Sequence, residues 1–173
     1  RSRFTSNQPV RGLVVNSGNA NCANGEKGIW DNEDFAAAAA TALSLGRVQD
    51  MLTASTGVVG QALPVDKLRV AMPAAVQALG DSSSPFSEAI VTTDTHTKQV
   101  SVQLRGGARI VGVAKGSGMI HPNMATMLAF VMTDAAFPQG ALRDLWPRVV
   151  NRSFNCITVD GDTSPNDMAF LLS

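Results

Sequence analysis

The sequence lacks three features that would place it in common classes of protein. Its 173 residues include only two cysteines, Cys22 and Cys156, too few and too widely spaced for a disulfide framework or a cysteine-based metal cluster. No apolar run reaches the length of about eighteen residues that a transmembrane helix needs. Lys and Arg number 14, as do Asp and Glu, so the formal net charge is zero. Neither nucleic acid nor a membrane is therefore predicted as a partner.

The remaining composition is ordinary for a soluble globular protein, and two reduced thiols favour a cytoplasmic location. Apolar residues make up 45% and charged residues 16% of a chain long enough for one domain. The run Ala36–Ala40 lies far from the N-terminus, inside a predicted helix, so it does not indicate a signal peptide. The chain begins at Arg1 and ends within the apolar stretch 168–172. We therefore expect residues 1–173 to be an internal, single catalytic-domain fragment of a longer protein.

Apolar spacing and turn residues predict a mixture of helices and strands. Asp31 or Asn32 is expected to cap the first helix, and Pro73 to break or kink the second. Helices are predicted at 31–45, 65–79 and 138–151, and strands at 12–15, 51–55, 127–133 and in a hairpin of 99–104 with 108–113. The irregular alternation favours an α/β fold with a mixed layered sheet over a doubly wound parallel sheet.

The most informative stretch runs from Lys115 to Leu128 and contains Ala125-Thr126, a small residue followed by a threonine that opens an apolar segment. If the Thr126 hydroxyl attacked the Ala125 carbonyl, water could open the resulting ester. Thr126 would then carry a free α-amine with a pKa of about 8, able to act as the base for its own hydroxyl. An Ala-Thr pair alone does not establish this chemistry, so its context matters.

A second candidate feature is the pair Thr56-Gly57 at the end of a predicted strand. Glycine lets a ligand approach its backbone closely, so a hydroxyl and a backbone N–H could point at one spot and hold an oxyanion. A simple glycine turn between strand and loop is the alternative. The Asn- and Gly-rich stretch 16–28 is consistent with an irregular turn or with a loop that orders a neighbouring site.

Lys115 precedes Gly116 and Gly118 in a stretch that superficially resembles a phosphate-binding loop. It fails that pattern, because the lysine comes before its glycine and Pro122 interrupts the following segment. A fixed positive charge for a substrate carboxylate is the functional interpretation, and an ordinary surface lysine is the alternative.

The acidic stretch 160–167 suggests two other activities. A calcium loop is excluded by Pro165 and Leu171, which stand where an EF-hand needs glycine and glutamate. A magnesium-dependent phosphatase, with Asp160 as nucleophile and Asp162 as general acid, stays open. It would not explain the other motifs.

Five segments in order resemble the ornithine acetyltransferase family, also called glutamate N-acetyltransferases. They are 14–21 (VVNSGNAN), 55–60 (STGVVG), 92–95 (TTDT), 115–128 (KGSGMIHPNMATML) and 158–164 (TVDGDTS). The resemblance covers nearly the whole chain. It implies a mixed α/β fold like that of this family and of self-processing aminopeptidases, which are a competing interpretation and usually expose a serine nucleophile.

The resemblance also implies roles for individual residues. The chain would cut itself between Ala125 and Thr126, with residues 1–125 in an α chain and 126–173 opening a β chain. Thr126 would accept an acetyl group from N2-acetylornithine and pass it to glutamate, in arginine biosynthesis. Thr56 and Gly57 would stabilise the oxyanion, and Lys115 and Thr93 would bind substrate, although Thr92 is an alternative to Thr93.

Further expectations concern cofactors and assembly. No metal or organic cofactor is predicted, although some members of the family also use acetyl-CoA as acetyl donor. The partners would be small-molecule substrates, and two α and two β chains would form a heterotetramer. An inactive fragment that needs the remaining segments of a longer protein is the non-enzymatic alternative.

Overall fold

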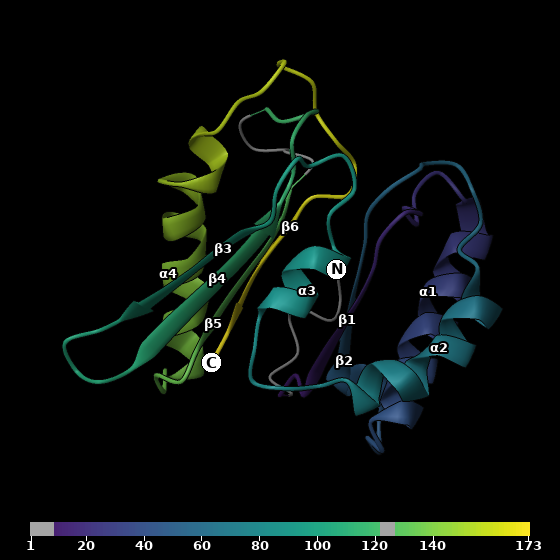
Figure 1. Ribbon diagram of the computed structural model, residues 1–173, viewed down its shortest axis with the longest axis horizontal. Helices are drawn as coiled ribbons and strands as arrows, with labels where there is room; N and C mark the ends of the chain where they lie inside the picture. The colour runs from purple at the N-terminus through teal and green to yellow at the C-terminus, as the bar shows by residue number, and fades with distance from the viewer. Residues whose placement is uncertain (1–8, 122–126) are drawn as a thin grey trace. The chain divides into compact units, whose positions relative to one another are not determined.

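The computed structural model describes residues 9–121 and 127–173, so Ala125 and Thr126 lie outside the described residues. The chain divides into two compact units, Arg1–Asp81 and Ser82–Ser173. Each unit combines helices with its own sheet (Figure 1). A mixed α/β fold is confirmed, whereas the single catalytic-domain fragment and its cleavage stay predictions.

The first unit is a strand–helix–strand motif followed by a second helix. Strands β1 (Gly12–Asn16) and β2 (Met51–Ser55) pair in parallel, with Gly12 opposite Met51 and Asn16 opposite Ser55. The connection contains α1 (Gly25–Ala42) and the short 3-10 helix η2 (Val48–Asp50), and α2 (Val65–Gln77) follows β2. Because the two strands are parallel and in register, Asn16 and Ser55 both stand at the carboxyl end of this sheet.

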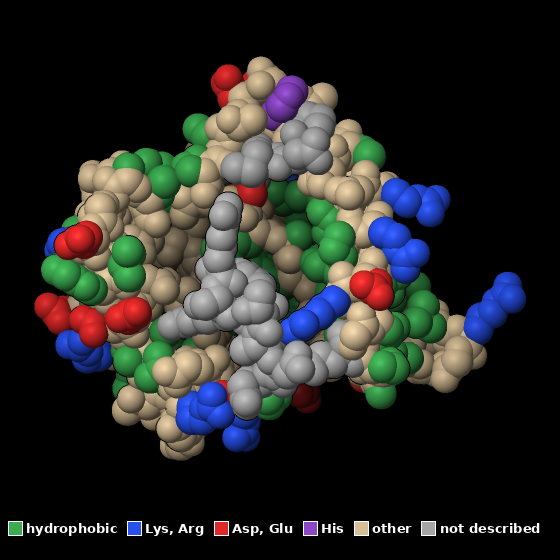
Figure 2. Space-filling view, turned by 180° about the vertical axis from the view of Figure 1, so that it is seen from behind, with side chains coloured by type: hydrophobic (Ala, Val, Ile, Leu, Met, Phe, Trp, Pro, Cys, Tyr) green, Lys and Arg blue, Asp and Glu red, His purple; other side chains and the backbone are tan. Residues whose placement is uncertain are grey.

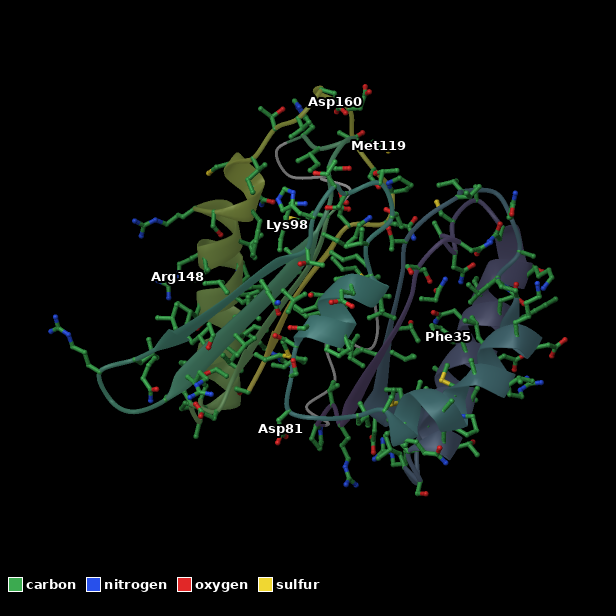
Figure 3. All side chains as sticks on the ribbon, viewed as in Figure 1. Phe35, Asp81, Lys98, Met119, Arg148 and Asp160 are labelled. Atoms are coloured by element: carbon green, nitrogen blue, oxygen red, sulfur yellow. The ribbon has the colours of Figure 1, made fainter. Side chains whose placement is uncertain are left out.

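The core of this unit forms between α1, α2 and β2. Phe35, Ala36, Ala39 and Ala40 are buried on one face of α1, because positions one, three, four and five apart share a helix face. They pack with Met51, Leu63, Val65 and Met72. Phe35, labelled in Figure 3, is 1% exposed, and burying such a side chain contributes about 2 kcal/mol.

Helix α1 begins earlier than predicted, and Pro73 does not break α2. Helix α1 begins at Gly25, so Asp31 lies within it and does not cap it. Asp31 is buried and accepts a hydrogen bond from Lys27 Nζ at 2.6 Å, an i,i+4 pair of the kind that stabilises helices. Helix α2 continues through Pro73 to Gln77. Apolar packing of α2 on α1 therefore outweighs the hydrogen bond that proline cannot donate.

The second unit is built on a four-stranded sheet in the order β3-β4-β5-β6. The strands are β3 (Lys98–Gln103), β4 (Arg109–Lys115), β5 (Leu128–Thr133) and β6 (Met168–Leu172). The hairpin β3–β4 is confirmed as antiparallel, β4 pairs antiparallel with β5, and β5 pairs parallel with β6. The helical segments are α3 (Ser84–Ala89), α4 (Gln139–Asn151) and η3 (Phe154–Cys156).

Aromatic contacts fix these helices to the sheet. Phe130 meets Phe86 of α3 edge-on at 5.0 Å and stacks with Phe170 of β6 at 5.4 Å between ring centroids. Trp146 of α4 donates its indole N–H to the Ala169 carbonyl at 2.9 Å, and α4 runs along the sheet in Figure 1. Strand β5 is buried at Leu128, Ala129 and Phe130 in succession, so both of its faces are covered there.

The surface agrees with the balanced composition. Basic and acidic side chains both appear on the face shown in Figure 2. Cys22 and Cys156 are free thiols. Within residues 9–121 and 127–173, no helix combines the length and apolar character that crossing a membrane would require.

Candidate active site

The predicted oxyanion pair lies in a tight turn at the end of β2. Thr56 is 3% exposed and its N–H donates to the Asn16 carbonyl at 3.1 Å. Gly57 follows with φ of +129°, a conformation that side chains rarely adopt. A Cβ at this position would stand 2.2 Å from the Gly18 carbonyl carbon and 2.5 Å from the Asn19 nitrogen. Glycine is therefore required both by conformation and by space.

The Asn-rich loop holds this turn in place. Val58 donates to the Gly18 carbonyl at 3.3 Å, and Ala20 donates to the Val58 carbonyl at 2.8 Å. The side chain of Asn16 spans the loop through a 2.7 Å bond to the Asn19 carbonyl. The structure shows an irregular turn that is hydrogen-bonded to Thr56 and Val58. That the loop orders a catalytic site stays a prediction.

Lys115, at the end of β4, is a buried lysine. It is 3% exposed, and its Nζ donates to Thr92 Oγ1 at 2.9 Å. Burial lowers the pKa of Lys115, because the charged form loses water, while the negative charges of Asp94 and Asp167 oppose that shift. A buried ammonium flanked by two carboxyl groups is not an ordinary surface lysine, so the structural alternative raised by the sequence is wrong.

Asp94 was not anticipated from the sequence and is central to this group. Its side chain is 1% exposed, and its Oδ1 accepts hydrogen bonds from Lys98 Nζ and, at 2.8 Å, from the Gly116 N–H. Burial alone would raise the pKa of Asp94, but these hydrogen bonds and the charges of Lys98 and Lys115 outweigh it and hold the pKa below its ordinary value. Asp94 thus stays ionised and fixes the chain just after Lys115.

The two neighbouring threonines take different positions. Thr92 receives the Lys115 hydrogen bond, whereas the Thr93 hydroxyl lies 2.8 Å from the Ser117 hydroxyl. Both threonines are exposed. The structure therefore brings Thr92, Thr93 and Lys115 into one cluster, and the choice between Thr92 and Thr93 as the substrate contact stays a prediction.

Two aspartates hold the backbone on either side of the segment that contains Ala125 and Thr126. Asp160 accepts the N–H groups of Met119 at 2.7 Å, Ile120 at 3.3 Å and Asp162 at 3.2 Å. The first of these bonds is the main reason that the pKa of Asp160 lies below its ordinary value. Because three backbone N–H groups occupy this carboxylate, the geometry argues against Asp160 as a phosphatase nucleophile.

Asp167 holds the other side. Its Oδ1 accepts the Met127 N–H at 2.9 Å, while its Oδ2 is buried without a hydrogen-bond partner among the described residues. Burial raises the pKa of Asp167 to about 6, although the Met127 N–H and the Lys115 charge act in the opposite direction. The sequence signal for this residue was its place at the end of the 160–167 motif, which did not reveal its partner.

The raised pKa of Asp167 predicts a pH-dependent stability. Between pH 4 and pH 6 the folded chain keeps a proton that the unfolded chain has lost, so stability falls as pH rises through this window. A shift from 3.8 to about 6 corresponds to at most about 3 kcal/mol. Since this carboxyl is only partly buried, we expect roughly 1 to 2 kcal/mol. Asp167→Asn should therefore gain stability relative to wild type from pH 4 to pH 8, measured by urea unfolding.

The control for this prediction is Asp162→Asn, which changes an exposed carboxylate five residues away. Its stability should follow wild type across the same pH range. An Asp167→Asn difference that does not change with pH would contradict the assignment of the titration to Asp167.

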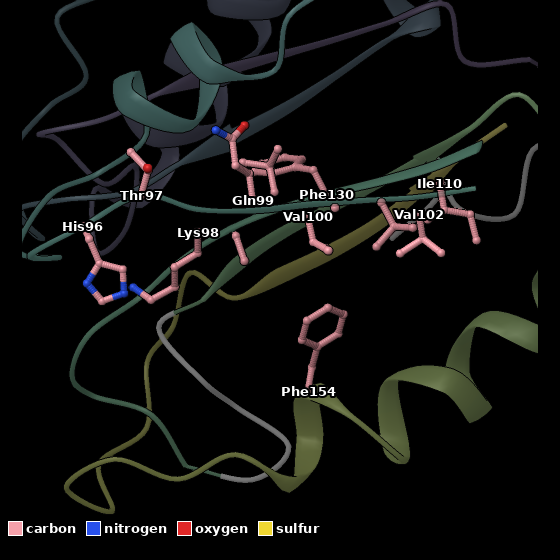
Figure 4. Close-up of a pocket in the computed structure, with 13 residues that line it drawn as sticks. His96, Thr97, Lys98, Gln99, Val100, Val102, Ile110, Phe130 and Phe154 are labelled. Carbon is pink, nitrogen blue, oxygen red and sulfur yellow. The ribbon is translucent and has the colours of Figure 1, made fainter. Parts of the chain in front are cut away.

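A groove of about 470 Å³ lies elsewhere on the second unit (Figure 4). Val100, Val102 and Ile110 of the hairpin and Phe154 of η3 form its apolar walls, with His96 and Lys98 near one end. None of Thr56, Gly57, Thr93 and Lys115 lines it.

Among the described residues there is also no group of three His, Cys, Asp or Glu side chains placed to hold a metal ion.

Comparison with known proteins gives a consistent result. The sequence profile of the ArgJ family matches residues 1–173. An arginine biosynthesis bifunctional protein ArgJ from Thermus thermophilus is 54% identical over the whole chain, and one from Deinococcus radiodurans is 52% identical. The chain spans 44% of the length of each of these relatives.

Two solved structures share the fold. An ornithine acetyltransferase from Mycobacterium tuberculosis, crystallised with ornithine, is 34% identical with a TM-score of 0.61, covering 64% of this chain and 61% of that protein. An ArgJ protein from Bacillus halodurans is 35% identical with a TM-score of 0.56, covering 67% and 61%. The family profile covers every motif from the Asn-rich loop to the 160–167 segment, and the chain belongs to the ArgJ family.

Proposed function

We propose that the full-length protein is a glutamate N-acetyltransferase that moves an acetyl group from N2-acetylornithine to glutamate after cutting itself at Ala125-Thr126. The observation that carries this proposal is family membership over residues 1–173, which include both the Ala-Thr pair and the Lys115 cluster. The bound ornithine of the Mycobacterium tuberculosis structure supports the substrate class.

The reaction divides into two half-reactions at one hydroxyl. Thr126 Oγ attacks the acetyl carbonyl, its proton passes to the Thr126 α-amine, and the amide C–N bond breaks as that proton goes to the departing amine of ornithine. The acetyl group is then an ester on Thr126. The glutamate amine attacks this ester and gives up a proton to the Thr126 α-amine, the C–O bond breaks, and that proton passes to the departing threonine oxygen.

Thr56 and Gly57 would stabilise the negative oxygen in both tetrahedral intermediates. The backbone on both sides of Gly57 is fixed, because Thr56 donates to the Asn16 carbonyl and Val58 to the Gly18 carbonyl. The Gly57 N–H itself makes no hydrogen bond inside the described part of the chain. In other enzymes, removing one preorganised N–H donor of this kind costs about 3 kcal/mol of transition-state stabilisation.

Lys115 would bind the α-carboxylate that ornithine and glutamate share. Asp94 and the Gly116 N–H fix the chain beside it, so the ammonium is held in one place before substrate arrives. One cationic site can serve both half-reactions because the two amino acids differ in side chain and not in their carboxylate. No metal or organic cofactor takes part, and the heterotetramer of two α and two β chains in the cytoplasm belongs to the same proposal.

The test is a kinetic and mass analysis of the full-length protein. Intact mass and N-terminal sequencing should show a second chain that begins Thr126-Met127-Leu128. Initial rates with acetylornithine and glutamate should give parallel double-reciprocal lines, as expected for a ping-pong mechanism. Intersecting lines would refute the acetyl-threonine intermediate. Release of CoA in a parallel assay with acetyl-CoA would establish the second donor.

A lysine substitution tests the carboxylate site. Lys115→Met keeps much of the side-chain length but removes the charge, so the KM values for acetylornithine and glutamate should both rise about 10- to 100-fold, the value of a charge-assisted hydrogen bond. Self-cleavage should continue. Lys67→Met, the same change at an exposed lysine of α2, should leave both constants unchanged. Unchanged KM values for Lys115→Met would remove Lys115 from substrate binding.

A further inference from the structure

The segment 158–168 holds the chain on both sides of the predicted cleavage site. On the upstream side, Ile120 donates to the Val159 carbonyl at 3.1 Å and accepts from the Val159 N–H at 2.7 Å. Thr158 Oγ1 adds a 3.3 Å bond to the Ile120 carbonyl. Both backbone polar groups of Ile120 are therefore satisfied by this one segment.

The downstream side is held in the same manner. Asp167 accepts the Met127 N–H at 2.9 Å, and the Met168 N–H donates to the Met127 carbonyl at 3.1 Å. Leu128 then pairs with Met168 as the first register position of β5 and β6. Met127 is thus the last residue before β5, and both of its backbone polar groups are bound by consecutive residues of the 158–168 segment.

The upstream contact also keeps an unfavourable backbone in place. Met119 has a φ of 56° and Asp160 a φ of 63°, a conformation that costs roughly 1 kcal/mol for residues other than glycine. Asp160 Oδ2 accepts the Met119 N–H at 2.7 Å, and the two residues lie side by side in Figure 3. A charge-assisted bond to a backbone N–H is strong enough to offset that cost.

We propose that the 158–168 segment is a brace for the predicted scissile bond, in which Asp160 positions the chain before that bond and Asp167 positions the chain after it. This role rests on the proposed function. It follows from the contacts because Ile120 and Met127, which flank the predicted scissile bond, are each bound through both backbone polar groups by this one segment. After cleavage, the bonds of Met119 and Ile120 to residues 158–160 would keep the end of the α chain joined to the β chain.

The test compares three alanine variants of the full-length protein, with two readouts. Amide hydrogen exchange, resolved to single residues by mass spectrometry, is measured in the uncut Thr126→Ala background. Asp160→Ala should speed exchange at Met119 about 10-fold, and Asp167→Ala should do so at Met127, in line with the loss of a hydrogen bond to a charged group. Exchange at Ile120 should change less, because its N–H keeps the bond to the Val159 carbonyl. Asp162→Ala is the matched control, since its exposed carboxylate lies in the same segment.

The second readout is the rate of self-cleavage with Thr126 present. Asp160→Ala and Asp167→Ala should slow cleavage at least about 10-fold relative to Asp162→Ala. Asp167→Asn keeps an acceptor oxygen for the Met127 N–H and should restore most of the rate. If Asp167→Ala does not fold, the cleavage rates of Asp167→Asn and Asp160→Ala test the positioning role instead.

The outcomes separate the brace from the proposed function. Unchanged exchange at Met119 and Met127, or equal effects of Asp162→Ala, would refute the brace. Faster exchange with an unchanged cleavage rate would refute its positioning role. If the wild-type chain is never cut, the proposed function fails, while the exchange rates still decide whether the segment holds the two flanks.

Discussion

Thr126→Ala should leave the full-length chain uncut and reduce acetyl transfer by at least about 10⁴-fold, the scale on which removing a catalytic nucleophile acts in other enzymes. Both effects have one cause, because the same hydroxyl attacks the Ala125 carbonyl during maturation and the acetyl carbonyl during turnover. The measurements are the intact mass, the N-terminal sequences and the initial rate. If N-terminal sequencing still finds a second chain that begins at position 126 in this variant, the Thr126 hydroxyl is not the group that cuts the Ala125–Thr126 bond.

Two companion proteins separate maturation from turnover. Thr126→Ser retains a hydroxyl and should still be cut, with reduced transfer. Expressing residues up to Ala125 and a second chain that begins with alanine at position 126 supplies the free α-amine without the hydroxyl. This pair should associate but not transfer acetyl groups. Activity in the pair would move the nucleophile to another residue.

Local patterns in the sequence predicted the elements that depend on local forces. The hairpin was found because Arg105-Gly106-Gly107 interrupts two alternating runs, and β2 and β5 because short apolar stretches are bounded by turn residues. The sequence places the start of α1 too late, because the asparagines and glycines of 16–28 favour a loop. The Lys27–Asp31 pair, four residues apart, was the signal for an earlier start.

Features that depend on distant parts of the chain were not predictable. Nothing local shows that β1 pairs in parallel with β2, or β5 with β6, since these partners are separated by a helix. The same holds for the site. Lys115 could be selected by resemblance, but its burial depends on Asp94, and the contact of Asp167 with Met127 joins residues 40 positions apart. A charged side chain is buried only where an opposite charge or a hydrogen-bonding group lies beside it, and the fold determines which groups lie there.

Gly57→Ala should be among the most disruptive single substitutions in the first unit. The new Cβ would lie 2.2 Å from the Gly18 carbonyl carbon and 2.6 Å from its oxygen, both of them backbone atoms that cannot rotate away. The φ of +129° adds conformational strain of about 1 to 3 kcal/mol. We expect a loss of more than about 3 kcal/mol in unfolding free energy, or a displaced turn, and a fall in acetyl transfer of at least about 10²-fold.

Gly60→Ala distinguishes the two causes of this loss. Gly60 lies in the same loop with a φ of +81°, but no atom lies within 4 Å of the position its Cβ would take. This variant carries the strain without the clash, so it should lose only about 1 kcal/mol and keep its activity. Urea unfolding and initial rates measure both variants.

If Gly57→Ala and Gly60→Ala lose equal stability, the close approach of Gly18 to Gly57 does not shape this turn. If Gly57→Ala loses stability but retains acetyl transfer, the turn is structural and its N–H does not hold the oxyanion. The expected result, a large loss of both at Gly57 and a small loss of stability alone at Gly60, follows from a loop whose backbone fixes one N–H for chemistry.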